Sequence, residues 1–173
     1  MDHAIERSTD VMHSEGTLAK IASLCTEAGW KCNDLLDRAV VVTLDVPGAL
    51  VKAKIEKSPK QGFRISVDAA STESWGKESM EALSLLLLKA NASARMARAS
   101  LVRSKGVVHS VLFDVSLSDE PTGHEVDQAL CALSVLVRFF GSEVRVMGNS
   151  KIARAYLAIS NVPCPLKGER RKT

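Results

Sequence analysis

Apolar residues first recur every three to four positions along the chain and then every second position. Thr17 can cap a helix, and Gly29 tolerates the left-handed conformation that commonly follows a helix end. The apolar residues between them keep a helical spacing: Leu18, Ile21, Ala22, Cys25 and Ala28. The pattern therefore predicts a first helix over residues 17–28.

The two-residue period of a strand follows, in which alternate side chains share one face. It runs through three segments, at residues 40–46, 50–56 and 63–68. Pro47 and Gly48 separate the first two segments, and residues 58–62 separate the second from the third. Both separators have the composition of turns. Because strands joined by such short turns pair antiparallel, the pattern predicts a meander.

Two longer helices are predicted further along, one apolar on nearly all sides and one amphipathic. The apolar helix follows Trp75 and contains Met80, Leu83, Leu85, Leu86, Leu87 and Leu88. A helix of this kind is usually buried on more than one side. The amphipathic helix starts at Ser118 or Thr122, and we expect Gly141 to end it. Its apolar stripe consists of Val126, Leu130, Leu133, Val137 and Phe140.

The remaining segments complete an α+β pattern. Residues 95–102 and 107–117 predict two strands joined by a turn at residues 104–106. Val144 and Val146 predict a short strand, and residues 151–159 predict a last helix. The order is α-βββ-α-ββ-α with a C-terminal extension. That order is typical of an antiparallel sheet with helices packed on it.

Composition is consistent with one globular domain. The chain has 173 residues, of which 46% are hydrophobic and 25% charged. We expect a polar lead-in at residues 1–15, a single α+β domain at 16–160 and a disordered basic tail at 161–173. No apolar signal segment precedes the domain and no run of apolar residues is long enough to span a bilayer, so we expect a cytoplasmic protein.

The cysteine and histidine residues do not form a recognisable catalytic or metal site. Cys25 and Cys131 fall on predicted apolar helix faces, where a free cysteine behaves as a small hydrophobe. Cys131 and His124 are two turns apart on one helix, about 10 Å by helix rise, which is too far for proton transfer. Nucleotide-binding and hydrolase signatures are absent from the sequence. We therefore expect no catalytic residues, no cofactor and no metal.

Two charged clusters each leave an alternative open. The chain carries a net charge of −2 over residues 1–90 and +5 over residues 91–173. The basic stretch Arg95, Arg98, Arg103 and Lys105 suits either a nucleic-acid surface or a charged strand edge that resists pairing. The acidic cluster is made up of Asp119, Glu120, Glu125 and Asp127. These carboxylates could hold a cation or complement a helix N-terminus, and the helix interpretation is favoured.

The stretch from Glu81 to Phe140 resembles type III secretion chaperones and the related YbjN-like domain. The matching text is EALSLLLLKANASARMARASLVRSKGVVHSVLFDVSL, followed by EVDQALCALSVLVRFF. In that family a leucine-rich helix is followed by a short strand, a glycine-containing turn, a longer strand and a closing helix. The resemblance covers residues 17–140. It implies a bacterial, non-catalytic homodimer that holds an extended segment of a partner protein.

These expectations define the function to be tested. We expect a protein-binding module whose partners are a second copy of the chain and another protein. We place the dimer interface at Leu83, Leu87, Leu88 and Met96, because the second helix has more apolar surface than a small sheet can cover. The alternatives are a nucleic-acid-binding protein that uses the basic C-terminal half and an enzyme with an unrecognised pocket.

Overall fold

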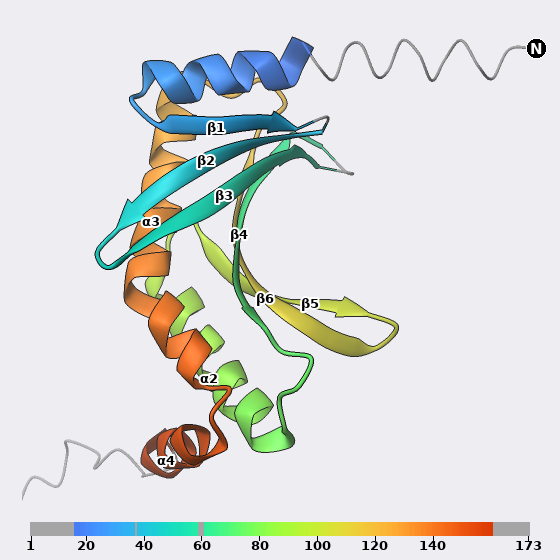
Figure 1. Ribbon diagram of the computed structural model, residues 1–173, viewed down its shortest axis with the longest axis vertical. Coiled ribbons are helices and arrows are strands. Elements are labelled where there is room, and N and C mark those ends of the chain that lie inside the picture. Colours follow the sequence, from blue (N-terminus) through green and yellow to red (C-terminus); the bar gives the residue numbers. More distant parts are fainter. Residues whose placement is uncertain (1–15, 37, 59–60, 161–173) are drawn as a thin grey trace, which may run out of the picture.

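The computed structural model describes residues 16–36, 38–58 and 61–160, so the expected lead-in at 1–15 and tail at 161–173 lie outside it. A helix over residues 16–27 comes first. The strands that follow are β1 (Lys31–Leu36), β2 (Ala39–Val46), β3 (Ala49–Lys57) and β4 (Phe63–Ser71). Helix α2 (Lys77–Ser93) then precedes β5 (Arg98–Ser104) and β6 (Val107–Leu117). Helices α3 (Gly123–Val146) and α4 (Ser150–Ser160) complete the described chain (Figure 1).

The six strands form one antiparallel sheet in the order β1-β2-β3-β4-β6-β5. Helix α3 lies across one face and contacts β2, β4 and β6, while α2 contacts β5, α3 and α4 (Figure 1). The expected α+β fold with an antiparallel sheet and helices packed on it is confirmed. Because α2 has neighbours on several sides, much of its apolar surface is buried within the chain itself.

The core lies between α3 and the sheet face that it covers. Val40, Val42 and Leu44 of β2 are fully buried on this face, and the neighbouring Val41 on the other face is buried to a lesser degree. Phe113 of β6 and Leu133 of α3 are buried equally completely, at 0% exposure. Burying a side chain of this size stabilises the fold by about 1.5–3 kcal/mol relative to leaving it in water.

Helix α3 begins at a capping box. The Thr122 hydroxyl accepts from the Glu125 backbone N–H, and the Glu125 carboxylate accepts from the Thr122 backbone N–H at 2.8 Å. This arrangement satisfies two backbone donors that a helix start would otherwise leave unpaired. Of the two predicted starts, Thr122 is therefore the correct one.

Two sequence predictions about the end of α3 need correction, and one strand was missed. The prediction that Gly141 ends the helix is wrong, because α3 continues to Val146 and buries Gly141 and Val144 against the rest of the fold. The short strand predicted at Val144 and Val146 is therefore the last turn of that helix. Strand β1 was not predicted at all, and its pairing with β2 shifts register between Cys32 and Asp34, which breaks the two-residue period.

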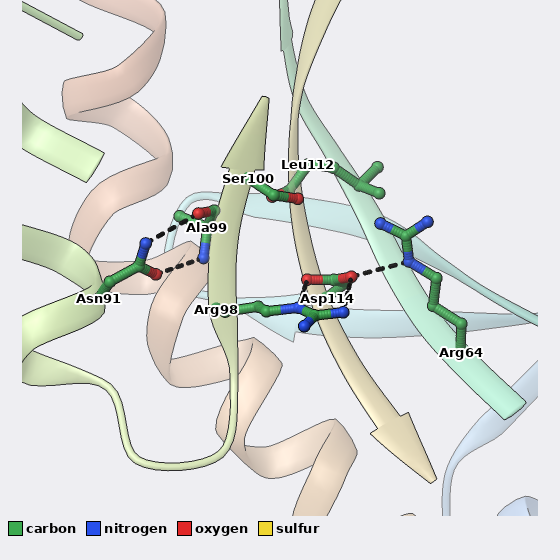
Figure 2. Close-up of polar contacts among 7 residues, drawn as sticks. All are labelled: Arg64, Asn91, Arg98, Ala99, Ser100, Leu112 and Asp114. Carbon is green, nitrogen blue, oxygen red and sulfur yellow. Dashed lines mark hydrogen bonds and ion pairs between the residues drawn. The ribbon is translucent and has the colours of Figure 1, made fainter. Parts of the chain in front are cut away.

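The other elements stand close to their predicted positions. The first helix, the strands β2, β3, β4 and β6, and the last helix are confirmed within a few residues. The strand predicted over residues 95–102 begins instead at Arg98, because α2 extends to Ser93 and a short loop follows it. Asn91 of α2 binds this strand at Ala99 through its side-chain amide (Figure 2). Its Oδ1 accepts from the Ala99 N–H at 2.6 Å, and its Nδ2 donates to the Ala99 C=O at 2.9 Å.

Candidate functional site: the open face of the sheet

Strands β3 and β4 are neighbours over only part of their length. They pair from Lys54 with Ser66 to Lys57 with Phe63, and beyond these pairs the two strands separate (Figure 1). Residues 49–53 of β3 pair only with β2, and residues 67–71 of β4 pair only with β6. The edges that these two segments turn toward each other therefore have no strand partner. We call this opening the β3–β4 gap. It leaves two strand edges inside the sheet, each with backbone groups that have no strand partner there.

The floor of the β3–β4 gap is formed by the far end of α3. Val137, Gly141 and Arg145 of that helix lie beneath Val51 of β3 and Val67 of β4. Because α3 continues past Gly141 to Val146, Arg145 lies beneath the gap as part of the helix.

The gap opens onto the sheet face opposite α3, which we call the open face. No helix of the described ranges packs on this face, and its side chains surround a hollow of about 620 Å³. The lining comes from β3, β4, β5, β6 and the end of α3, and includes Lys52, Lys54, Arg64, Asp68, Leu112 and Arg145. Most of this lining is polar or charged, in contrast to the apolar face beneath α3, although Leu50, Val51, Val102 and Leu112 also belong to it.

Asp114 pairs with Ser66 of the lining and is the centre of a cluster of three charged residues next to the hollow. It lies on β6, between Arg64 on β4 and Arg98 on β5, and both arginines reach it from opposite sides (Figure 2). Arg64 donates its Nε–H to Oδ2 at 2.8 Å. Arg98 donates its Nε–H to Oδ1 at 2.9 Å and an Nη2–H to Oδ2 at 3.2 Å. The hydrogen bonds and charge of Asp114 raise the pKa of Arg98 above its ordinary value.

Burial differs sharply within this triad. The Asp114 side chain is fully buried, whereas the Arg64 and Arg98 side chains are 39% and 62% exposed. The two arginines thus cover the carboxylate and remain available to solvent. Because a buried carboxylate needs a counter-charge, these contacts hold both guanidinium groups against Asp114.

The four residues predicted to form a dimer interface differ in burial. Leu83 and Leu87 lie in the core of the chain, while Leu88 and Met96 are exposed. Met96 and Val135 line a second, apolar hollow of about 320 Å³ between the loop after α2 and the outer side of α3. A homodimer stays a prediction, and Leu88 and Met96 are the two members of the set that could contact a partner.

The acidic residues around the start of α3 have separate local roles. Glu125 belongs to the capping box, and the Trp30 Nε1–H donates to Asp127 at 2.9 Å, which ties the residue after the first helix to α3. Asp119 accepts the Gly62 N–H at 2.7 Å. Hydrogen bonds from Gln61 and Gly62 lower the pKa of Asp119. The helix interpretation is thus supported by contacts for Glu125 alone among the described members of this cluster, while Asp119 and Asp127 bind groups outside α3.

The cysteine predictions were half right. Cys25 is buried as expected, and burial together with neighbouring Cys32 raises its pKa to about 12. Cys131 is exposed, contrary to expectation, because it follows Leu130 in α3 and so points away from the sheet side of the helix. The His109 ring contacts two nearby groups. Its Nε2 is 3.3 Å from the Ser104 carbonyl oxygen, and its Nδ1 is 3.4 Å from the Glu73 carboxylate.

Comparison with known proteins shows a likeness of fold. No protein-family model matches the chain, and no curated protein sequence matches it significantly. Among solved structures it is similar to the crystal structure of YbjN from E. coli, described as a proposed transcription regulator. The TM-score is 0.53 and the identity 17%, over 73% of this chain and 92% of that chain. This finding supports the YbjN-like fold and not membership of the secretion-chaperone family.

None of the described helices is both long enough and apolar enough to cross a membrane.

Proposed function

We propose that this chain is a non-catalytic binding module that takes an extended segment of another protein on the open face of its sheet. The segment enters the β3–β4 gap and pairs with one or both of the strand edges there. The observation that carries the proposal is the partial pairing of β3 with β4. It leaves residues 49–53 of β3 and residues 67–71 of β4 with no strand partner on the edges that face each other.

Strand addition is a common way for proteins to bind extended peptides. Main-chain hydrogen bonds supply affinity, and the side chains around the added strand supply specificity. The β3–β4 gap is suited to this mode because its two edges face each other across a short opening with α3 beneath. Alternate residues of an added strand would point toward Val137 and Arg145 below and toward the open face above.

Nucleic-acid binding is the main alternative on the same surface. Sheet-based RNA binders also expose one sheet face with helices behind it, but they stack bases on aromatic side chains of that face. None of the described residues that line the hollow is aromatic. An aromatic-free surface with several exposed cations favours a protein segment over a single-stranded nucleic acid.

The proposal can be tested without knowing the natural partner. A display library of random twelve-residue peptides is selected against the whole chain, and a selected peptide is then used in hydrogen–deuterium exchange with mass spectrometry. We expect peptide binding to slow exchange at residues 49–53 and 67–71. Protection confined to the outer side of α2 and α3 would show that the segment binds elsewhere, and failure to enrich any peptide would refute the binding-module function.

A further inference from the structure

A buried aspartate is an unusual residue for a strand face that no helix covers. Asp114 alternates with Phe113 and Val115, so its side chain lies on the open face and not in the core. Serine or threonine would fit such a position without the cost of desolvating a charge. The consequence of having aspartate there is that Arg64 and Arg98 are drawn toward each other and held against the sheet.

The two arginines keep hydrogen-bonding capacity that Asp114 does not use. An arginine side chain has five N–H donors. Arg64 gives one of them to Asp114 and Arg98 gives two, and no other ion pair of either residue occurs in the described part of the chain. Because Asp114 restricts both side chains, less conformational entropy remains to be lost when a ligand engages the donors that are left.

The charges around the arginines favour an anionic ligand. Lys54 and Glu56 pair with each other on β3, which removes both from the balance. Outside the triad, the remaining charged residues that line the hollow are Lys52, Arg145 and Asp68, which together carry a net positive charge. The triad of Arg64, Arg98 and Asp114 adds one further positive charge. Planar guanidinium groups bind carboxylates in a paired geometry that a lysine cannot reproduce.

We propose that the segment bound at the open face is acidic, and that Arg64 and Arg98 bind its carboxylates while Asp114 positions both arginines. This inference rests on the proposed function, because it names the chemistry of the segment that the β3–β4 gap accepts. Arg145 at the floor of the gap provides a further cation for a side chain that points inward. The partner is thus a protein segment in which aspartate or glutamate recurs at alternate positions.

The test uses the peptides selected from the random library against the whole chain. Each selected peptide is compared with a version in which every Asp and Glu becomes Asn and Gln, and affinities are measured by fluorescence anisotropy. The protein variants are Arg64→Gln and Arg98→Gln. Arg138→Gln, on the exposed side of α3, is the matched control because it removes the same charge away from the open face. Circular dichroism melting confirms that each variant is folded.

We expect the selected peptides to be rich in Asp and Glu and to lose at least about tenfold in affinity when those residues become amides. Arg64→Gln and Arg98→Gln should each weaken the acidic peptide by about tenfold and leave its amide version unchanged, while Arg138→Gln changes neither. Arg98→Lys keeps the positive charge but loses the planar set of guanidinium donors. The affinity of this variant for the acidic peptide should therefore fall as well.

Asp114→Asn separates positioning from net charge. This variant makes the open face more positive but removes the charge that holds the arginines. We expect weaker binding of the acidic peptide, and tighter binding would show that net charge and not orientation sets the affinity.

Other outcomes distinguish this inference from the proposed function. Selected peptides that lack acidic residues, yet protect residues 49–53 and 67–71 from exchange, would overturn the acidic preference and leave the binding module standing. Failure to select any peptide would overturn both. A single-stranded oligonucleotide that displaces the acidic peptide, with an affinity that falls steeply with salt, would replace the peptide by a nucleic acid as the ligand.

Discussion

Gly62 lies in the turn that brings β4 back alongside β3, just before the residues at which the two strands pair. Its φ angle is +73°, in the left-handed region that favours glycine. A Cβ added here would be 2.0 Å from the carbonyl oxygen of Leu117, which belongs to the backbone of β6 and cannot rotate away. Gly62 also donates its N–H to Asp119. Substituting alanine should therefore disturb the backbone of two strands at once.

The magnitude can be separated into two parts by a matched glycine. Gly48, in the β2–β3 turn, has a φ of +85° but nothing within 4 Å of an added Cβ. Gly48→Ala therefore carries only the left-handed strain of about 1–2 kcal/mol, less about 0.4–1 kcal/mol gained because the unfolded chain becomes stiffer. Gly62→Ala adds overpacking of about 1–3 kcal/mol against the Leu117 carbonyl, and it also moves the N–H that donates to Asp119.

We therefore expect Gly62→Ala to lower the free energy of unfolding by about 2–4 kcal/mol and Gly48→Ala by about 1 kcal/mol. Such a loss is a large fraction of the roughly 5–15 kcal/mol typical of a domain. Urea unfolding followed by far-ultraviolet circular dichroism measures both values. If the two variants differ by less than about 1 kcal/mol, the contact with the Leu117 carbonyl does not govern this turn and the reasoning is wrong.

Three further predictions concern assembly, acid and thiol chemistry. Leu88→Glu should leave the fold intact because the side chain is 66% exposed, and it should convert a dimer into monomers in sedimentation equilibrium; a monomeric wild type would contradict the dimer. The hydrogen bond from Thr122 lowers the pKa of Glu125, so its contribution to stability is present above its ordinary value of 4.5 and is lost as pH falls through the folded-state pKa. Urea titrations at decreasing pH should therefore show the stability gap between wild type and Glu125→Gln closing in acid. Alkylation by iodoacetamide at about pH 8 should modify Cys131 before Cys25 in native protein, as mapped by peptide mass spectrometry, because Cys25 is buried with a pKa of about 12; equal rates would refute its burial.

The elements that could be predicted from sequence are those whose burial follows one regular period. Val40, Val42 and Leu44 alternate with polar or less buried residues, so the strand was predicted correctly, while the choice of its buried face came only with the structure. Strand β1 escaped prediction because its bulge shifts the period and its sequence KCNDLL has no alternation of apolar residues. The end of α3 was misplaced because the statistical preference for glycine after a helix was outweighed by packing, which buries Gly141 and Val144.

The candidate site depends on strand order, which local pattern does not determine. Arg64 and Asp114 lie in two predicted strands, but they are 50 residues apart in the sequence. Their contact requires β4 to lie beside β6, and that arrangement follows from how the whole sheet packs against α3. Arg98 was noted as part of a basic stretch, yet its partner could not be named before the register of β5 with β6 was known.

The amide of Asn91 has a consequence for the outer edge of the sheet. By binding the N–H and C=O of Ala99, it occupies the groups that a strand of a neighbouring molecule would need in order to dock along β5 (Figure 2). Exposed strand edges allow end-to-end polymerisation of sheets, and a side chain that saturates one residue of the edge interrupts the ladder. Asn91 thus acts as a chain terminator at this edge. It hinders strand addition at β5, where growth would be open-ended, whereas strands on both sides would limit addition at the proposed β3–β4 gap.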